Sequence, residues 1–98
     1  MYRDIITYQL ADNITKEHLI KVAQEVHSNW MKDQAGFISW EIHENKDGSF
    51  TDIVTWESEE AVKKSHDNMG NISNSREWFA CYKEGTIGSK FITQVAKF

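Results

Sequence analysis

The sequence predicts an α+β fold in which a four-stranded antiparallel sheet carries helices on one face. Three observations predict this class. Apolar side chains recur every second residue in some segments and every three to four residues in others. A turn motif joins two strand segments, and the order strand, helix, two strands, helices, strand runs without a linker or low-complexity tract. Because the chain has 98 residues, we assign residues 1–98 to a single domain.

The first strand is predicted over residues 2–10 and the first helix over residues 16–31. Thr15 offers a hydroxyl as the N-cap of this helix. The more apolar face of the strand, which we expect to meet the helices, carries Tyr2, Ile6, Tyr8 and Leu10. The helix has one apolar stripe at helical spacing, formed by Leu19, Val22, Ala23, Val26 and Trp30.

Two further strands are predicted over residues 37–44 and 50–56. The sequence NKDG at residues 45–48 is a turn signal, because Asn and Gly accept positive φ angles at little cost. The two strands should therefore pair as an antiparallel hairpin. In the first of them, alternation places Trp40 on one face and a second set on the other, namely Phe37, Ser39, Glu41 and His43.

The second half of the chain contains two more helices and a last strand. Ser58 is a good N-cap for a helix that Gly70 ends. Asn74, with a glutamate three residues later, resembles a capping box for a short helix over residues 75–83. The last strand is predicted to begin at residue 87 or 90 and to run to residue 98.

This order of elements predicts how the layers pack. Two right-handed crossovers on either side of a hairpin give the ferredoxin-like arrangement, a four-stranded antiparallel sheet with helices on one face. The opposite sheet face still presents rows that contain large apolar side chains, and their burial is worth about 25 cal/mol per Å². We therefore expect a homodimer that forms through this exposed sheet face.

Composition excludes several classes of partner. The net charge is −4 and no cluster of Lys or Arg stands out, so nucleic acid is not an expected partner. No segment approaches the roughly 18–20 apolar residues that span a bilayer. The first ten residues lack the features of a secretory signal, so we expect a cytoplasmic protein. Cys81 is the only cysteine, and no two histidines have close ligand spacing, so we expect no metal site.

Two sequence motifs resemble the antibiotic biosynthesis monooxygenase-like group. One is Ala35-Gly36-Phe37 at the start of the second strand, and the other is TWESEEA at residues 55–61, followed by His66. In element order the resemblance covers nearly the whole chain. It implies a dimeric α+β barrel. The enzymatic members oxidise electron-rich aromatic or polycyclic molecules without metal or flavin, so the resemblance implies no cofactor.

The sequence departs from the family in two places. The family histidine lies one residue nearer the tryptophan, where this chain has Ser65, and one residue is about 100° of helix rotation. The haem-degrading branch uses an Asn on the first strand, where this chain has Thr7 and Gln9, and Arg76 lies near the expected position of the haem ligand. Haem degradation is therefore disfavoured.

The resemblance and the residue types together suggest a substrate site between sheet and helices. Tyr8, Trp56 and Trp78 are the predicted substrate-binding walls, and His66 is the predicted acid–base or oxyanion-binding group. The alternative for each aromatic is an ordinary core position, and for His66 a solvated helix surface. Cys81 is interpreted as a small buried apolar side chain. Trp40, Phe79 and Tyr82 are further candidates for the walls.

These observations leave two hypotheses for the function. The first is a cofactor-independent monooxygenase-like protein that acts on an aromatic or polycyclic small molecule. The alternative is a non-catalytic dimeric barrel that binds a small ligand, since a fold does not itself supply a reaction. The hypotheses differ in whether Trp56 and His66 line one cavity.

Overall fold

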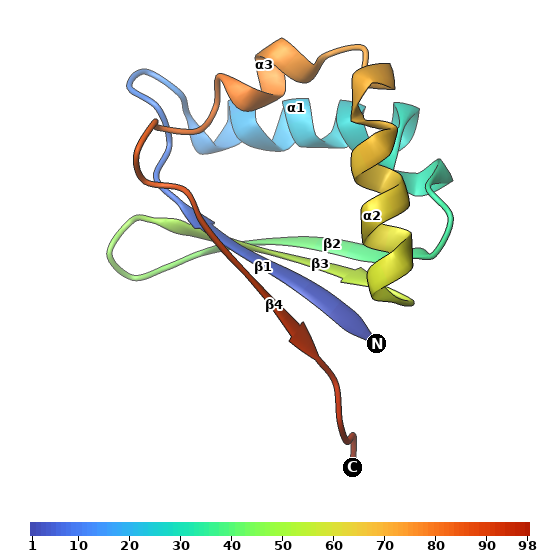
Figure 1. Cartoon of the computed structure of the whole chain (residues 1–98). Coiled ribbons are helices and arrows are strands. Elements are labelled where there is room, and N and C mark those ends of the chain that lie inside the picture. Colours follow the sequence, from blue (N-terminus) through green and yellow to red (C-terminus); the bar gives the residue numbers. More distant parts are fainter.

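In the computed structural model, which describes residues 1–98, one antiparallel sheet carries the helices on a single face (Figure 1). This confirms the predicted ferredoxin-like class. The order of strands across the sheet is β2-β3-β1-β4. The strands are β1 (Tyr2–Tyr8), β2 (Phe37–Glu44), β3 (Phe50–Trp56) and β4 (Gly88–Thr93). The α-helices are α1 (Lys16–Asn29), α2 (Glu59–Asp67) and α3 (Ser75–Phe79), and two short 3-10 helices are η1 (Met31–Asp33) and η2 (Met69–Asn71).

Both predicted N-caps of the long helices are confirmed. The Thr15 hydroxyl accepts a hydrogen bond from the His18 amide at 3.1 Å, which starts α1. The Ser58 hydroxyl accepts one from the Ala61 amide at 3.2 Å, which starts α2. Each bond satisfies an amide that has no partner inside its helix. Local sequence signals therefore position the two helices that cover the sheet.

The third capping prediction is wrong. The Asn74 side chain makes no capping bond to α3. Its amide group instead donates to the Val22 carbonyl at 3.4 Å and to the Glu25 carboxylate at 3.3 Å, both on α1. Asn74 therefore holds α3 against α1, which lie side by side above the sheet (Figure 1).

Several predicted element ends are too late, because backbone groups find other partners. β1 ends at Tyr8 rather than at residue 10, and α3 ends at Phe79 rather than at residue 83. The segments after these two ends pair with each other, through bonds from the Lys83 amide to the Gln9 carbonyl and from the Ala11 amide to the Cys81 carbonyl, each 2.9 Å.

The C-terminal ends of α1, α2 and β4 also come earlier than predicted. α1 gives way to the 3-10 turn η1 two residues before the predicted end, and α2 ends at Asp67 before η2. β4 ends at Thr93 rather than at residue 98, because the last bond across the ladder joins the Gln94 amide to the carbonyl of Met1 at 2.9 Å.

A β-bulge in β2 changes the face on which one aromatic side chain lies. Phe37 pairs with Trp56 and Ser39 with Thr55, so Ile38 is the extra residue. Simple alternation places Phe37 with Ser39, and that prediction is wrong. The bulge turns Phe37 to the helix side, where its ring meets the Trp56 ring edge-on at 5.6 Å.

Close contact between the hairpin and α2 requires the glycine of the Ala35-Gly36-Phe37 motif. Gly36 has a φ of +80°, and a Cβ at this position would lie 2.6 Å from the Cβ of Ala61. Both the backbone conformation and the spacing therefore exclude a side chain. The Gly36 carbonyl also accepts a bond from the Glu57 amide at 2.8 Å, which ties the start of β2 to the end of β3.

The face of the sheet opposite the helices has no cover within the chain. The strand register places Ile5, Ile53 and Ile92 on this open face, together with Glu41 and His43, whose side chains lie 2.9 Å apart. Beyond β4 the C-terminal segment extends away from the body of the molecule (Figure 1). Its Val95 and Phe98 side chains are fully exposed.

No helix of the chain has the length and apolar character that crossing a bilayer demands.

Candidate functional site

A cavity of about 120 Å³ lies between the sheet and the helices. Side chains from seven elements form its wall, so it exists only in the folded chain. Eight of its twelve lining residues are hydrophobic. The lining residues are Asp4, Ile6, Trp30, Met31, Trp40, Asp52, Val54, Trp56, Ser65, His66, Met69 and Trp78.

The most unusual group in this wall is the carboxyl of Asp52, in the middle of β3. Its side chain is 1% exposed and lies in a row of apolar neighbours on the helix side of the sheet. The Tyr8 hydroxyl donates to Oδ1 at 2.7 Å, and the Trp40 indole N–H donates to Oδ2 at 3.0 Å. Burial raises the pKa of Asp52 from 3.8 to about 6, although these two hydrogen bonds favour the ionised form. Asp52 therefore changes protonation state close to neutral pH.

Tyr8 lies behind this carboxyl and does not line the cavity. It is 1% exposed, and its ring packs between those of Phe50 and Tyr82, with centroids at 5.9 Å and 4.5 Å. Burial and the adjacent Asp52 raise the pKa of the Tyr8 hydroxyl far above its ordinary value. Tyr8 therefore stays protonated and acts as a fixed hydrogen-bond donor that positions Asp52.

Two tryptophans form one corner of the cavity. The Trp40 and Trp78 rings are inclined at 57° with centroids 5.6 Å apart. Trp40 is fixed by its bond to Asp52, and the Trp78 indole N–H donates to the hydroxyl of Tyr82. Since Tyr82 also contacts Tyr8, the rings around Asp52 are connected to one another. This corner is therefore a rigid part of the wall.

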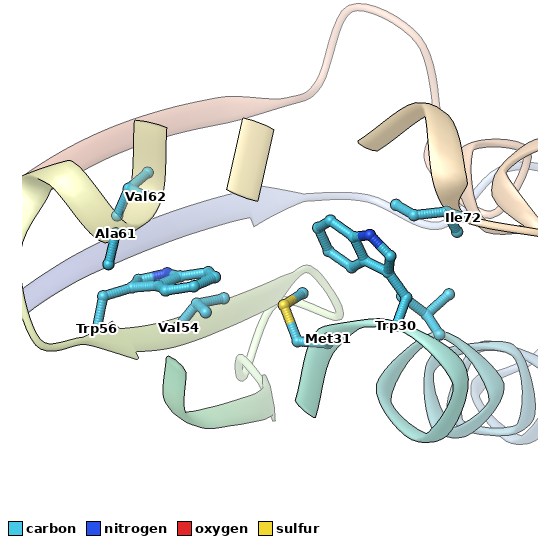
Figure 2. Packing of buried hydrophobic residues seen from close by; sticks show 8 residues of the cluster. Trp30, Met31, Val54, Trp56, Ala61, Val62 and Ile72 are labelled. Carbon is cyan, nitrogen blue, oxygen red and sulfur yellow. The ribbon is translucent and has the colours of Figure 1, made fainter. Parts of the chain in front are cut away.

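Trp56 and Trp30 also line the cavity, and both belong to the buried cluster shown in Figure 2. Trp56 lies at the end of β3 and is covered by Ala61 and Val62 of α2. Trp30 comes directly after α1, and its indole N–H donates to the Asn68 carbonyl at 3.1 Å, which links α1 to the segment after α2. All four tryptophans of the chain therefore line one cavity.

His66 and Asp4 lie together at one side of the cavity. His66 lines it while remaining exposed to solvent, and the preceding residue, Ser65, is buried and donates to the Val62 carbonyl at 2.7 Å. Burial raises the pKa of Asp4, while a 2.9 Å hydrogen bond from Ser89 and the neighbouring His66 act to lower it. Because the histidine of this chain comes one residue after the family position, the buried residue there is Ser65 and the imidazole of His66 lies at the margin of the cavity.

The structure brings together three of the four predicted site residues. His66, Trp56 and Trp78 line the cavity, whereas Tyr8 contacts it only through Asp52. Among the further candidates, Trp40 lines the cavity, and Phe79 is half exposed and stacks on Trp78 from outside. Cys81 is fully buried and its thiol pKa is raised, as suits a small packing residue.

Sequence reasoning did not identify Asp52 or Asp4 as parts of the site. A signal for Asp52 was present, because Phe50, Asp52, Val54 and Trp56 form one alternating row of β3 with a single polar member. A carboxyl in such a row is rarely buried without a partner. Asp4 gives no comparable signal, since a polar residue near a chain end is common.

The structure places no group of three or more His, Cys, Asp or Glu side chains that could hold a metal ion.

The fold and the site define an α+β protein with a small, tryptophan-lined cavity between sheet and helices. No protein-family model matches the sequence, and the curated proteins contain no significant match to it. Solved structures do match. The monooxygenase from the gene ActVA-Orf6 of Streptomyces coelicolor, in complex with nanaomycin D, has a TM-score of 0.76 at 19% identity over 99% of this chain and 89% of its own.

Two other structures extend this similarity. SnoaB, a cofactor-independent oxygenase from Streptomyces nogalater, has a TM-score of 0.77 at 13% identity, covering 98% of this chain and 94% of its own. A conserved protein from Methanosarcina mazei Go1 has a TM-score of 0.70 at 10% identity, covering 93% and 89%. The chain therefore has the fold of antibiotic biosynthesis monooxygenase-like proteins, as predicted.

Proposed function

We propose that this protein is a cofactor-independent monooxygenase that acts on an aromatic small molecule bound in the tryptophan-lined cavity. The observation that carries the proposal is that Trp56 and His66 line one cavity together with the buried carboxyl of Asp52. The presence of two oxygenases among the proteins of similar fold is consistent with it.

The proposed chemistry requires only a base, a dry pocket and dioxygen. A substrate with an acidic C–H beside a phenol or ketone loses a proton, and the resulting carbanion donates electrons to dioxygen. A C–O bond forms to give a hydroperoxide. Loss of water from this hydroperoxide breaks the O–O bond and leaves a carbonyl, so that one oxygen atom enters the product and the other leaves as water. The substrate supplies all the electrons.

The residues divide these tasks by their positions. His66, at the margin of the cavity, exchanges protons with solvent and is our acid–base residue. Trp56, Trp78 and Trp40 provide the aromatic walls and exclude water. Asp52, held by Tyr8, is a second group that can accept a proton near neutral pH. A cavity of about 120 Å³ holds only part of an aromatic substrate, so the remaining rings of a polycyclic substrate would extend past His66 into solvent.

Oxygen consumption with anthrone-like phenols tests the proposal. We expect turnover by the wild type, a loss of about 10²-fold or more in kcat for His66→Ala, and weaker substrate binding for Trp56→Phe. His18→Ala, at an exposed position of α1 that does not line the cavity, is the matched control and should keep full activity. Equal turnover by wild type, His66→Ala and Trp56→Phe would remove both residues from the mechanism.

The alternative function is a non-catalytic barrel that binds a small ligand. Solvent exposure of His66 favours it, because a general base usually lies in a less hydrated position. Saturable binding of phenols by calorimetry, without oxygen consumption by any variant, would select this alternative.

We also propose that the protein is a homodimer that pairs through the open face of the sheet. Ile5, Ile53 and Ile92 form the apolar part of this face, and Val95 and Phe98 extend beyond it without intrachain partners. Burial of such side chains favours association.

Light scattering at micromolar concentration tests the dimer. We expect about twice the chain mass of 11.4 kDa for the wild type and the mass of one chain for Ile53→Lys. Ile20→Lys, which changes an exposed isoleucine on α1 away from this face, should remain dimeric. A monomeric wild type would rule out this assembly.

A further inference from the structure

The charges in the cavity wall are unevenly distributed. Two of the twelve lining residues are carboxylic acids, Asp4 and Asp52, and none is Lys or Arg. The only other ionisable lining group is His66, which lies beside Asp4 at the margin. No lining residue therefore places a positive charge next to Asp52.

Asp52 in particular has no charged hydrogen-bond partner, and the basic side chain that acts on it, His43, lies on the other face of the sheet. The two donors to Asp52, Tyr8 and Trp40, are both neutral. A carboxylate can accept about four hydrogen bonds, so its oxygens keep free acceptor positions next to the cavity. A fully buried ion that has only neutral partners is unfavourable, so such a carboxyl either takes up a proton or is stabilised by a bound cation.

The rest of the wall has the composition of a site for organic cations. All four tryptophans line this space, and the ring planes of Trp40 and Trp78 are inclined at 57° to each other. The face of an indole ring attracts positive charge more strongly than that of Tyr or Phe, and desolvation strengthens the attraction. Aromatic walls combined with a carboxylate are how proteins recognise quaternary ammonium groups.

The size of the cavity limits what can enter. Its volume of about 120 Å³ is slightly smaller than the roughly 150 Å³ cavity that holds a benzene molecule. A trimethylammonium group fits these limits, whereas an aromatic substrate would enter only in part.

We propose that the cavity binds the positively charged end of a small organic ammonium compound, with Asp52 as its counter-charge and Trp40 and Trp78 as its aromatic wall. This inference rests on the proposed function, because it names the chemical class of the molecule that the same cavity takes. The substrate would then be an aromatic molecule that carries an ammonium group, with the ammonium end inside the cavity.

Calorimetric titration under nitrogen with two matched probes tests the inference. Choline and 3,3-dimethyl-1-butanol have nearly the same shape, and only choline is charged. We expect the wild type to bind choline at least about tenfold more tightly than the neutral alcohol. This comparison needs no variant, so it does not depend on the folding of a mutant. Equal affinity, tighter binding of the alcohol, or no detectable binding of choline would overturn the inference.

Two variants then assign the charge to Asp52. Asp52→Asn should weaken choline binding about tenfold or more and leave binding of the alcohol unchanged. Asp47→Asn, which removes an exposed carboxylate from the β2–β3 turn, should bind both probes as the wild type does. Unchanged choline binding by a folded Asp52→Asn would overturn the role of this residue.

The binding and turnover experiments fail independently. Choline selectivity without oxygen consumption would leave this inference standing and remove the oxygenase proposal. Oxygen consumption with neutral phenols and no selectivity for choline would support the oxygenase proposal and overturn this inference.

Discussion

Replacement of Trp56 by alanine is expected to lower the free energy of unfolding by about 3–5 kcal/mol. Trp56 is 4% exposed and is packed by Val54, Ala61 and Val62, with the Phe37 ring edge-on against it. Its removal leaves a cavity that α2 cannot fill, because Gly36 and Ala61 already hold the hairpin and α2 in close contact. Urea denaturation followed by circular dichroism measures the change.

A second tryptophan serves as the control for this experiment. Trp78→Ala removes the same side chain from a partly buried position on α3, and it should cost clearly less than Trp56→Ala. Because a domain of this size has only about 5–15 kcal/mol of stability, Trp56→Phe is a useful intermediate, with an expected loss of about 1–2 kcal/mol. An equal loss for both alanine variants would contradict the central position of Trp56 in the core.

The second large effect is a pH-dependent change in stability caused by Asp52. Its pKa is 3.8 in the unfolded reference and about 6 in the folded protein, so the folded state binds the proton more tightly. The stability of the wild type relative to Asp52→Asn should therefore fall as the pH rises from about 4 through 6. The total change is about 3 kcal/mol, since each pKa unit corresponds to about 1.4 kcal/mol.

The sign of this dependence distinguishes Asp52 from other carboxyls. Below about pH 4 the group is protonated in both states and the difference is constant, and above about pH 7 the full penalty applies. The pKa of Asp47 is lowered by hydrogen bonds from Ser49, so the stability of the wild type relative to Asp47→Asn should instead rise with pH. Urea denaturation at about pH 4 and about pH 7.5 provides the comparison. A constant difference between wild type and Asp52→Asn would show that this carboxyl is not perturbed by burial.

The fold could be predicted because its determinants are local. The stripe of α1 and the capping hydroxyls of Thr15 and Ser58 act within one or two helical turns, and the turn at residues 45–48 fixes the hairpin. The errors arose where a distant partner decided the outcome. Asn74 is held by α1, 49 residues away from Glu25, and β1 ends at Tyr8 because the residues after it pair with the chain near Tyr82.

The site was less predictable, because it depends on register and on contacts between elements. Trp56, Trp78 and His66 could be selected from residue type and spacing. The role of Asp52 depends on contacts with Tyr8 on β1 and Trp40 on β2, which no local pattern encodes. The apolar row of β3 marks Asp52 as buried, but it does not show which donors the carboxyl meets.

The bulge at Ile38 has a consequence for aggregation. β2 is an edge strand of the sheet, and an uninterrupted edge invites strands of other molecules to add to it. The extra residue interrupts the regular spacing of the free backbone groups and twists the strand locally. Deletion of Ile38 would restore a regular edge and leave Phe37 paired with Trp56 on the helix side, and the resulting chain should form fibrillar aggregates more readily than the natural sequence.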